Sequence, residues 1–346
     1  MNPLRRSLLR LLGAAGAVTA APGLALAERI RILPDGSAPV APGTPGVTSP
    51  ELSRALGALT PGPAVAGSGL AVVWLLGGVK GDPAPLEVLT LDEARASSAL
   101  TVVERAQASV PELIAENRGQ IPVLLLAGEI LIGGKQNRVL REDLVLPPLS
   151  GPRNIAVYCV EQGRWNEGRK EFESRASVVQ PSVRSQVLGK ADQRRIWSGV
   201  AAATQAAHAA APTGSYQAVY ESSDVRAHLD RAARHLETPA PGARGAAVFV
   251  GSRLAGVDVF HAASLFAREW PKLLRAHALD TYRAPAGAWD EAAARHRLDG
   301  LLRDARRAEG TRRPSPGAGH LFEFAIERQR GAALLVEEQM LHLAIL

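Results

Sequence analysis

The acid Glu129 and the polar run that follows it are the residues of this chain best suited to chemistry. Glu129 interrupts an apolar stretch, and burial there would raise its pKa towards the range of general acid-base catalysis. The alternative is an exposed position at an edge strand or turn. Two glycines then lead into a run of four polar side chains, which are Lys135, Gln136, Asn137 and Arg138. Because turned backbone amides and cationic side chains attract anions, this run predicts a site for a phosphate or carboxylate.

The Gly-Gly-Lys sequence at 133–135 differs from the phosphate loop of nucleotide triphosphatases. That loop requires Gly, four residues and then Gly-Lys-Ser/Thr. Gly128 lies one residue too far away, and Gln136 occupies the position of the hydroxyl that would hold magnesium. The sequence therefore predicts looser anion binding and excludes this triphosphatase motif.

A second polar patch follows the apolar segment 153–160. Its members are Glu161, Gln162, Arg164 and Trp165. We expect it to face the first patch across a shared cleft, with Trp165 as a stacking surface for a ring. Hydrolysis is the simplest reaction for such a cleft, with Glu129 or Glu161 activating water while the cationic side chains hold the substrate's charge. In the alternative interpretation the same residues form a buried polar network that fixes the fold of a non-catalytic binding or scaffold module.

Other catalytic classes lack their motifs in this chain. No Gly-x-Ser-x-Gly or His-Glu-x-x-His sequence occurs, and the eight histidines show no metal-ligand spacing, so no metal site and no particular cofactor are predicted. Cys159 is the only cysteine, which excludes an intramolecular disulfide.

Residues 1–27 have the layout of a cleavable export signal, with a basic start, an apolar middle and Ala25-Leu26-Ala27 before Glu28. Arg5-Arg6 within it is typical of the twin-arginine route, and a general secretory signal is the alternative. We therefore expect a periplasmic or secreted protein that meets the membrane only during export.

Removal of the signal lowers the formal net charge from +6, because three arginines leave with it. No Lys/Arg block is interleaved with aromatic residues, so nucleic acid is not an expected partner. A small anionic ligand is the expected partner, and no protein partner can be inferred.

The mature chain divides by composition into a leader and one domain. Residues 28–61 are rich in Pro, Gly and Ser and predict a mobile leader containing at most a short helix near 50–59. A single α+β domain is expected over 62–346, with a variable excursion at about 281–325. Short apolar runs in the first half indicate an antiparallel β-meander, helical spacing appears in the second half, and 332–346 suit a closing hairpin.

Individual elements follow from the same patterns. A helix is expected over 92–98 with Asp92 as its cap, another over 183–210, and one over 264–279 bent near Pro271. A hairpin is expected across Gly251-Ser252-Arg253. Strands are expected at 64–65, 70–76, 86–91, 100–105, 112–117 and 153–160. The stretch 121–132 is expected to form either one long strand or two strands kinked at Ala127-Gly128.

Several of these segments together resemble one bacterial family. GEILIGGKQNRVL (128–140), CVEQGRW (159–165), GSRLAGVDVF (251–260), WPKLL (270–274) and LHL (341–343) occur in the order seen in the ADP-ribosylglycohydrolase- and rhodanese/phosphatase-associated protein domain. The resemblance implies a role near NAD or ADP-ribose metabolism and supplies no reaction. The resemblance supports the residues of both polar patches, taken together, as site residues. The predicted export signal, in contrast, would place this protein away from cytoplasmic NAD.

Overall fold

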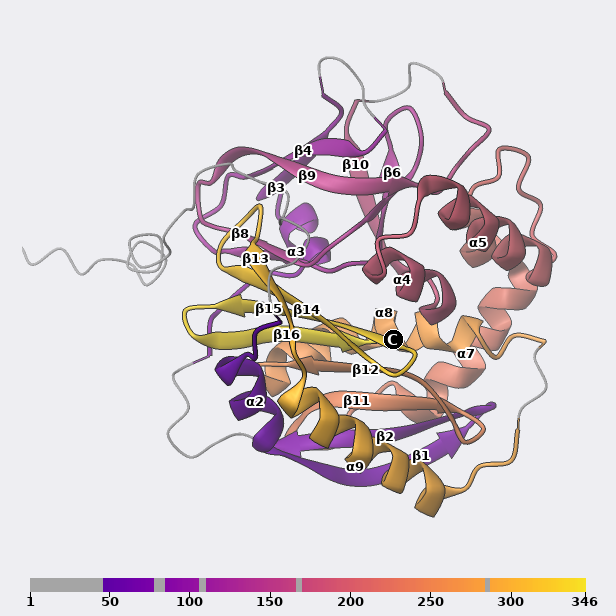
Figure 1. Cartoon of the computed structure of the whole chain (residues 1–346). Helices are drawn as coiled ribbons and strands as arrows, with labels where there is room; N and C mark the ends of the chain where they lie inside the picture. Colours follow the sequence, from indigo (N-terminus) through magenta and orange to yellow (C-terminus); the bar gives the residue numbers. More distant parts are fainter. Residues whose placement is uncertain (1–45, 78–84, 106–109, 166–169, 284–286) are drawn as a thin grey trace, which may run out of the picture.

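The computed structural model describes residues 46–77, 85–105, 110–165, 170–283 and 287–346 (Figure 1). The expected signal, with Arg5-Arg6, and the leader up to residue 45 lie outside the described residues. The described part is an α+β structure built mainly from antiparallel strands, as the sequence predicts. No helix in these ranges is long and apolar enough to cross a membrane.

Eight antiparallel strands form the larger sheet, in the order β1-β2-β11-β12-β16-β15-β14-β13. Both predicted hairpins belong to it, and they lie next to each other in the middle of the sheet, where β12 pairs with β16. The strand bounds are β1 (Leu59–Gly67), β2 (Leu70–Gly77), β11 (Ala243–Val250), β12 (Arg253–Phe260), β13 (Gly310–Pro314), β14 (His320–Ile326), β15 (Gln329–Val336) and β16 (Gln339–Ile345).

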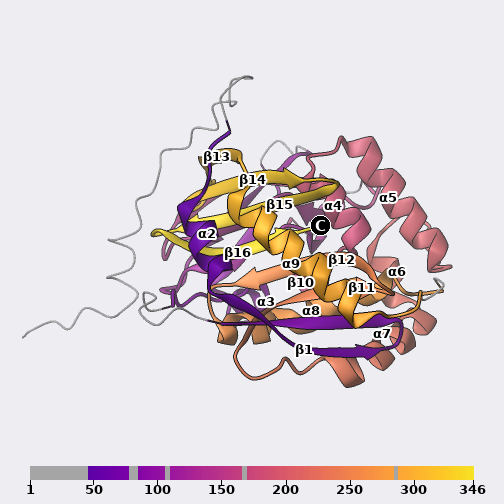
Figure 2. The same cartoon turned by 60° about the horizontal axis from the view of Figure 1, so that its bottom comes forward.

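Helices cover both faces of this sheet, which explains why its strands are apolar on both sides. Alternate residues of β2 show the division: Leu70, Val72 and Trp74 share a core with α7 (Ser223–Leu236) and α8 (Ala263–Leu279). Ala71, Val73 and Leu75 share another core with α2 (Pro50–Gly57) and α9 (Glu291–Arg307). Figures 1 and 2 show α9 lying across the strands of the large sheet.

The smaller sheet closes on itself. Its order is β10-β6-β7-β9-β4-β3, and a bridge between Val103 and Glu171 joins the two outer strands. A third core fills the interior, shared with the short pair β5–β8. We call this unit the barrel. Its strands are β3 (Leu100–Val103), β4 (Glu112–Asn117), β5 (Val123–Leu125), β6 (Glu129–Gly133), β7 (Arg138–Leu140), β8 (Leu144–Leu146), β9 (Gly151–Cys159) and β10 (Phe172–Val178).

Four further helices complete the described part: α3 (Leu91–Ala96), α4 (Pro181–Leu188), α5 (Gln193–Ala206) and α6 (Gln217–Glu221). The helix expected over 183–210 is therefore two helices, which are separated by residues 189–192. The segment expected as a strand at 86–91 makes only an isolated bridge at Leu89, because α3 begins within it and uses Thr90 as its cap. The prediction that Asp92 caps this helix is therefore wrong.

The structured region extends beyond the boundaries that composition suggests. α2 and the start of β1 lie upstream of residue 62, and Leu52 and Leu56 of α2 are buried. Within 281–325, β13 and β14 continue the large sheet. The apolar stretch 121–132 breaks near Ala127 into β5 and β6, the kinked form of the two that were expected.

Candidate functional site

A sharp corner at residues 126–128, between β5 and β6, positions Glu129. Gly128 has a φ of +94°, and a Cβ there would lie 2.9 Å from the Cγ atom of Arg184, so only glycine fits. The corner turns the Leu126 amide onto Glu129, whose Oε2 atom accepts a hydrogen bond from it at 2.7 Å. Glu129 therefore faces inward and is only 1% exposed.

Lys272 of α8 is the counter-ion of Glu129. Its Nζ atom bonds Glu129 Oε1 and lies 2.8 Å from Asp92 Oδ2. It lies 2.8 Å from Glu269 Oε2 as well. Three carboxyls thus surround one ammonium group, and we call these four side chains the lysine cluster. Both glutamates and the lysine are buried, so the cluster meets solvent mainly through Asp92, whose side chain is 30% exposed.

Burial sets the protonation of the lysine cluster. It raises the pKa of Glu129 to about 8 against the attraction of Lys272, and it raises the pKa of Glu269 in the same direction. Burial alone would lower the pKa of Lys272, but the surrounding carboxyls hold it well above its usual value. The lysine is therefore charged, and the cluster retains a carboxyl proton near neutral pH because three buried carboxylates around one cation would be poorly solvated.

The position of Asp92 follows from the capping of α3. Thr90 and Glu93 form a reciprocal capping box there, with each side chain accepting from the other's backbone amide. The carboxylate of Asp92 is left free to accept from the Ser174 hydroxyl and from Lys272. The residue expected to cap the helix instead forms the solvent-facing end of the lysine cluster.

The glycine turn at 133–134 packs tightly against β10. A Cβ on Gly134 would lie 2.3 Å from the Phe172 ring, and one on Gly133 would lie 2.4 Å from the Glu171 carbonyl oxygen. Protein acceptors already take the amides of the turn: Gly133 N donates to Asn137 Oδ1 at 3.0 Å and Lys135 N to Glu104 Oε1 at 3.1 Å. The amides of this turn are therefore not free to receive an anion.

The two predicted polar patches do meet. Glu161 Oε2 accepts from the Asn137 amide at 3.0 Å and from Arg164 at 2.7 Å, while Glu161 Oε1 accepts from the Thr213 hydroxyl at 2.7 Å. Burial opposes ionisation of Glu161, but these bonds to Arg164, Thr213 and Asn137 outweigh it and lower its pKa. Glu161 is thus an ionised carboxylate with both oxygens engaged.

Arg164 completes the connection between the patches. Its guanidinium donates to the carbonyl oxygens of Gly134 at 2.8 Å and Gly133 at 3.1 Å. It donates to Asn137 Oδ1 as well, at 3.0 Å. Arg164 is therefore committed mainly to the protein, although its side chain remains 23% exposed.

Gln136 and Arg138 lie deeper in the same region. Arg138 is fully buried and donates to the backbone oxygen and to Oε1 of Gln136, both at 3.1 Å. Gln136 Oε1 accepts from the Cys159 thiol at 3.2 Å, and Gln136 Nε2 donates to the Gln162 carbonyl at 3.4 Å. Glu104 lies 3.6 Å from the Arg138 guanidinium and is its counter-ion. These residues form a polar network inside the protein.

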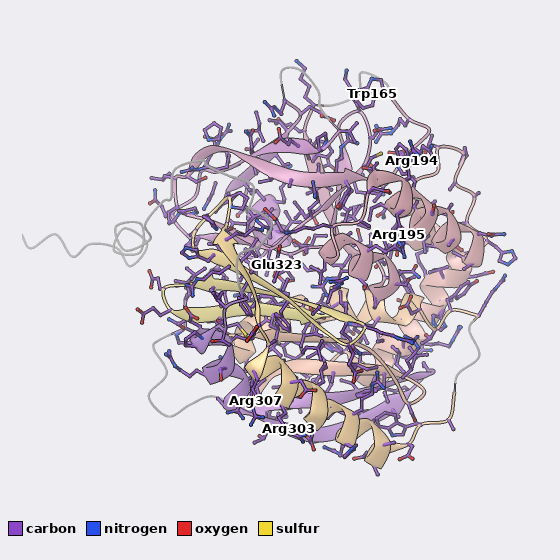
Figure 3. The ribbon with its side chains drawn as sticks, in the orientation of Figure 1. Trp165, Arg194, Arg195, Arg303, Arg307 and Glu323 are labelled. Carbon is purple, nitrogen blue, oxygen red and sulfur yellow. The ribbon has the colours of Figure 1, made fainter. Side chains whose placement is uncertain are left out.

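Lys135 and Trp165 lie on the outside of that network. The Nζ atom of Lys135 lies 5.2 Å from the centre of the Trp165 ring, a cation–π arrangement. Trp165 is 52% exposed and projects from the outer edge of the barrel (Figure 3). We call Lys135, Arg164 and Trp165 the tryptophan face, because they are the predicted ligand-binding side chains with charge or ring surface open to solvent.

The two predicted acids lie at opposite ends of β6. Glu129 begins the strand and Gly133 ends it, a separation of about 13 Å at the usual rise of a strand. Glu161 lies near the Gly133 end of β6, where it accepts hydrogen bonds from the Asn137 amide and from Arg164. The structure therefore joins Glu161 to the polar patches and Glu129 to the lysine cluster.

A second buried cluster has no counterpart among the predicted site residues. Asp143 Oδ2 lies 2.6 Å from His342 Nδ1, and His342 Nε2 lies 3.2 Å from Asp258 Oδ1. Arg184 donates to the same Asp258 oxygen at 2.7 Å. His277 Nε2 approaches Asp258 Oδ2 at 3.6 Å. All five side chains are at most 2% exposed, and we call them the histidine cluster.

The corner at 126–128 connects the two clusters. The amide of Ala127 donates to Asp143 Oδ1 at 2.7 Å, and its carbonyl accepts from Arg184 Nε at 2.8 Å. Burial opposes ionisation of Asp258, yet Arg184 and the two histidines hold its pKa well below the usual range. Burial alone would lower the pKa of His342, but Asp143 and Asp258 raise it to about 9.

One feature of the sequence marks the members of the two buried clusters that were not among the predicted site residues. Lys272, Asp258 and His342 are each a single ionisable residue inside an otherwise apolar segment, WPKLL, GVDVF and LHL. A buried charge requires a partner, so each segment indicates a buried ion pair. The sequence does not reveal which partner, because the partners come from distant elements.

Stability should fall as pH rises from 6.5 to 9. His342 has a raised folded-state pKa, so its contribution is complete below its unfolded pKa of 6.5 and is lost as pH rises through about 9. Glu129 acts in the same direction between 4.5 and about 8. Urea unfolding at pH 6.5 and 9 measures the change. His342→Asn should give a shallower decline, and a wild-type stability that rises over this interval would contradict the assignment.

Within the described ranges no group of three or more His, Cys, Asp or Glu side chains is placed to hold a metal ion. The fold and its charged interior define an α+β protein in which a closed barrel is joined to a large antiparallel sheet by two buried ionic clusters. The chain belongs to the family of the ARG and Rhodanese-Phosphatase-superfamily-associated Protein domain, ARPP-1, whose model matches residues 59–346. Searches of curated proteins and of solved structures found no match.

Proposed function

We propose that this chain is an exported module that binds a small anionic ligand carrying an aromatic ring, an ADP-ribose-like compound, on the tryptophan face. The observation that carries the proposal is the exposed ring of Trp165 beside the ammonium group of Lys135. An exposed ring can stack on a base, while Lys135 and the exposed part of Arg164 attract phosphate.

The polar network beneath the tryptophan face supports binding without catalysis. Glu161, Asn137 and the backbone of the glycine turn satisfy one another and the Arg164 guanidinium. Such a network holds the exposed side chains in place, which reduces the entropy lost when a ligand binds. The same bonds leave Glu161 poorly suited to activating water, because its pKa is lowered and both of its oxygens are engaged.

Removal of the ring or of the amine should weaken binding. Trp165→Ala should reduce the affinity for ADP-ribose by about 5- to 150-fold, since base stacking on an aromatic side chain contributes about 1–3 kcal/mol. Lys135→Met should reduce it as well and make it less dependent on salt. Isothermal titration calorimetry measures both effects, after a thermal-shift screen with ADP-ribose, NAD, sugar phosphates and dicarboxylates.

Lys190→Met is the matched control, because Lys190 is 47% exposed and lies on another surface. It should leave the affinity unchanged. Equal affinity of the wild type and Trp165→Ala would reject the tryptophan face, as would a screen in which no compound raises the melting temperature.

Hydrolysis by Glu129 is the second candidate function, and the raised pKa of this carboxyl, about 8, favours it. Water or substrate would have to reach Glu129 past Asp92. If the protein cleaves a ligand found in the screen, Glu129→Gln should abolish turnover and leave binding unchanged. Turnover that survives this change would exclude Glu129 as the acid or base.

The export part of the proposal rests on the predicted signal, residues 1–27. Cell fractionation of a variant with Lys-Lys at positions 5 and 6 tests the twin-arginine route. Continued periplasmic delivery would contradict it.

A further inference from the structure

A cavity of about 390 Å³ lies on another part of the molecule, between α4, the start of β12 and the turn that joins β14 to β15. Its lining includes Ser182, Ser185, Arg253, Ala255, Asp280 and Arg328. Its volume is within the range of about 300–1,000 Å³ found for small-molecule sites. None of these residues belongs to the tryptophan face.

Two arginines give the cavity its cationic character. Arg253 begins β12, and Arg328 lies in the β14–β15 turn. In the part of the chain that the structure describes, no carboxylate lies within ion-pair distance of either guanidinium. Asp280, in the same cavity, attracts Arg253 only at longer range. Two guanidinium groups that flank one cavity without a close ion pair can receive an anion by charge-assisted hydrogen bonds.

Asp280 supplies the complementary acceptor in the same cavity. It caps the end of α8, and its Oδ1 atom accepts from Gln180 Nε2 at 2.8 Å and from the Ser182 hydroxyl at 3.1 Å. These bonds fix the carboxyl group in place. A carboxyl group that lines a cavity can accept hydrogen bonds from the hydroxyl groups of a polyol.

The interior behind the cavity is polar. The elements that line it also carry Arg184, Asp258 and His277, and Arg184 Nη2, Asp258 Oδ2 and His277 Nδ1 are buried with no hydrogen-bond partner among the described residues. A Cβ on Gly256 would lie 2.5 Å from Leu346 Cδ2 in the cavity wall and 3.1 Å from His277 Cε1. Because Gly256 has no side chain, His277 of the histidine cluster can pack close to the inner side of the cavity wall.

We propose that this cavity is a second binding site, for a sugar phosphate. The phosphate lies between Arg253 and Arg328, and the sugar hydroxyls face Asp280 and Ser182. The site is separate from the tryptophan face and does not depend on it.

Calorimetric titration of the full chain with ribose 5-phosphate tests the site. Arg253→Gln and Arg328→Gln should each weaken binding about tenfold or more, since a hydrogen bond to a charged group contributes about 1.5–3 kcal/mol. Asp280→Asn should weaken the binding of ribose 5-phosphate relative to that of inorganic phosphate, because it removes the acceptor for the sugar hydroxyls. Loss of the negative charge near Arg253 should not weaken the binding of inorganic phosphate. Ribose alone should bind too weakly to measure.

Arg330→Gln is the matched control, because this exposed arginine lies two residues from Arg328 and outside the cavity. It should leave binding unchanged, and so should Trp165→Ala, which separates this site from the tryptophan face. The proposal is overturned if the wild type does not bind ribose 5-phosphate, or if Arg253→Gln and Arg328→Gln bind it as the wild type does. Equal affinity for inorganic phosphate and ribose 5-phosphate would overturn the assignment of a sugar.

Discussion

Lys272→Met should lower the free energy of unfolding by about 3–5 kcal/mol, because removal of one partner leaves buried charge without compensation. Lys272 is the cation shared by Glu129, Glu269 and Asp92, and it is 4% exposed. Methionine matches the length of the lysine stem, so little packing is lost. Urea unfolding at neutral pH measures the effect.

Two further variants test whether the loss of stability comes from the buried charges of the lysine cluster. Lys190→Met removes a surface ion pair with Glu323 and should cost at most about 1 kcal/mol. Glu129→Gln in the Lys272→Met background should restore part of the loss, because it removes one of the stranded carboxyls. A loss for Lys272→Met no larger than that for Lys190→Met would show that the lysine cluster contributes little.

Arg184→Met should have a similar cost, about 3–5 kcal/mol. Its guanidinium bonds Asp258 at 2.7 Å and the Ala127 carbonyl at 2.8 Å, and both lose a buried partner. The pKa of Asp258 should rise when Arg184 is removed, because Arg184 is the leading cause that lowers it. Since a lowered acid pKa stabilises the fold above that pKa, the variant should lose less stability than the wild type when the solution is acidified.

Arg275→Met is the control for this experiment, because Arg275 forms an exposed pair with Asp230. Its cost should be at most about 1 kcal/mol. Equal costs for Arg184→Met and Arg275→Met would contradict a structural role for the histidine cluster, and so would an unchanged acid transition.

Local patterns predicted much of the fold. The hairpins at 251–253 and 337–338 follow from apolar runs on either side of a short polar turn, and the structure confirms both. β4, at 112–117, is confirmed at both ends. These elements depend on neighbouring residues, so their patterns are visible in one short stretch.

Long-range contacts were not predictable in the same way. The bridge that closes the barrel joins Val103 to Glu171, and no local pattern identifies that pair. Asp92 was predicted to cap the helix because its carboxylate can accept a hydrogen bond from an early helical amide, yet Thr90 caps the helix and Asp92 contacts Lys272. The polar patches at 133–138 and 161–165 were found from their residue types, whereas the inward direction of most of their side chains came from packing.

The corner at 126–128 has a consequence for how the chain folds during synthesis. The corner lies in the barrel, beside the buried acids Glu129 and Asp143, but the cations that pair with these acids are synthesised much later. Lys272 is 143 residues beyond Glu129, and His342 is 199 residues beyond Asp143. A nascent chain that ends after the barrel would hold these acids without their cations. Contacts of such high sequence separation slow folding, so the barrel reaches its final stability only when the last strand, β16, has been made.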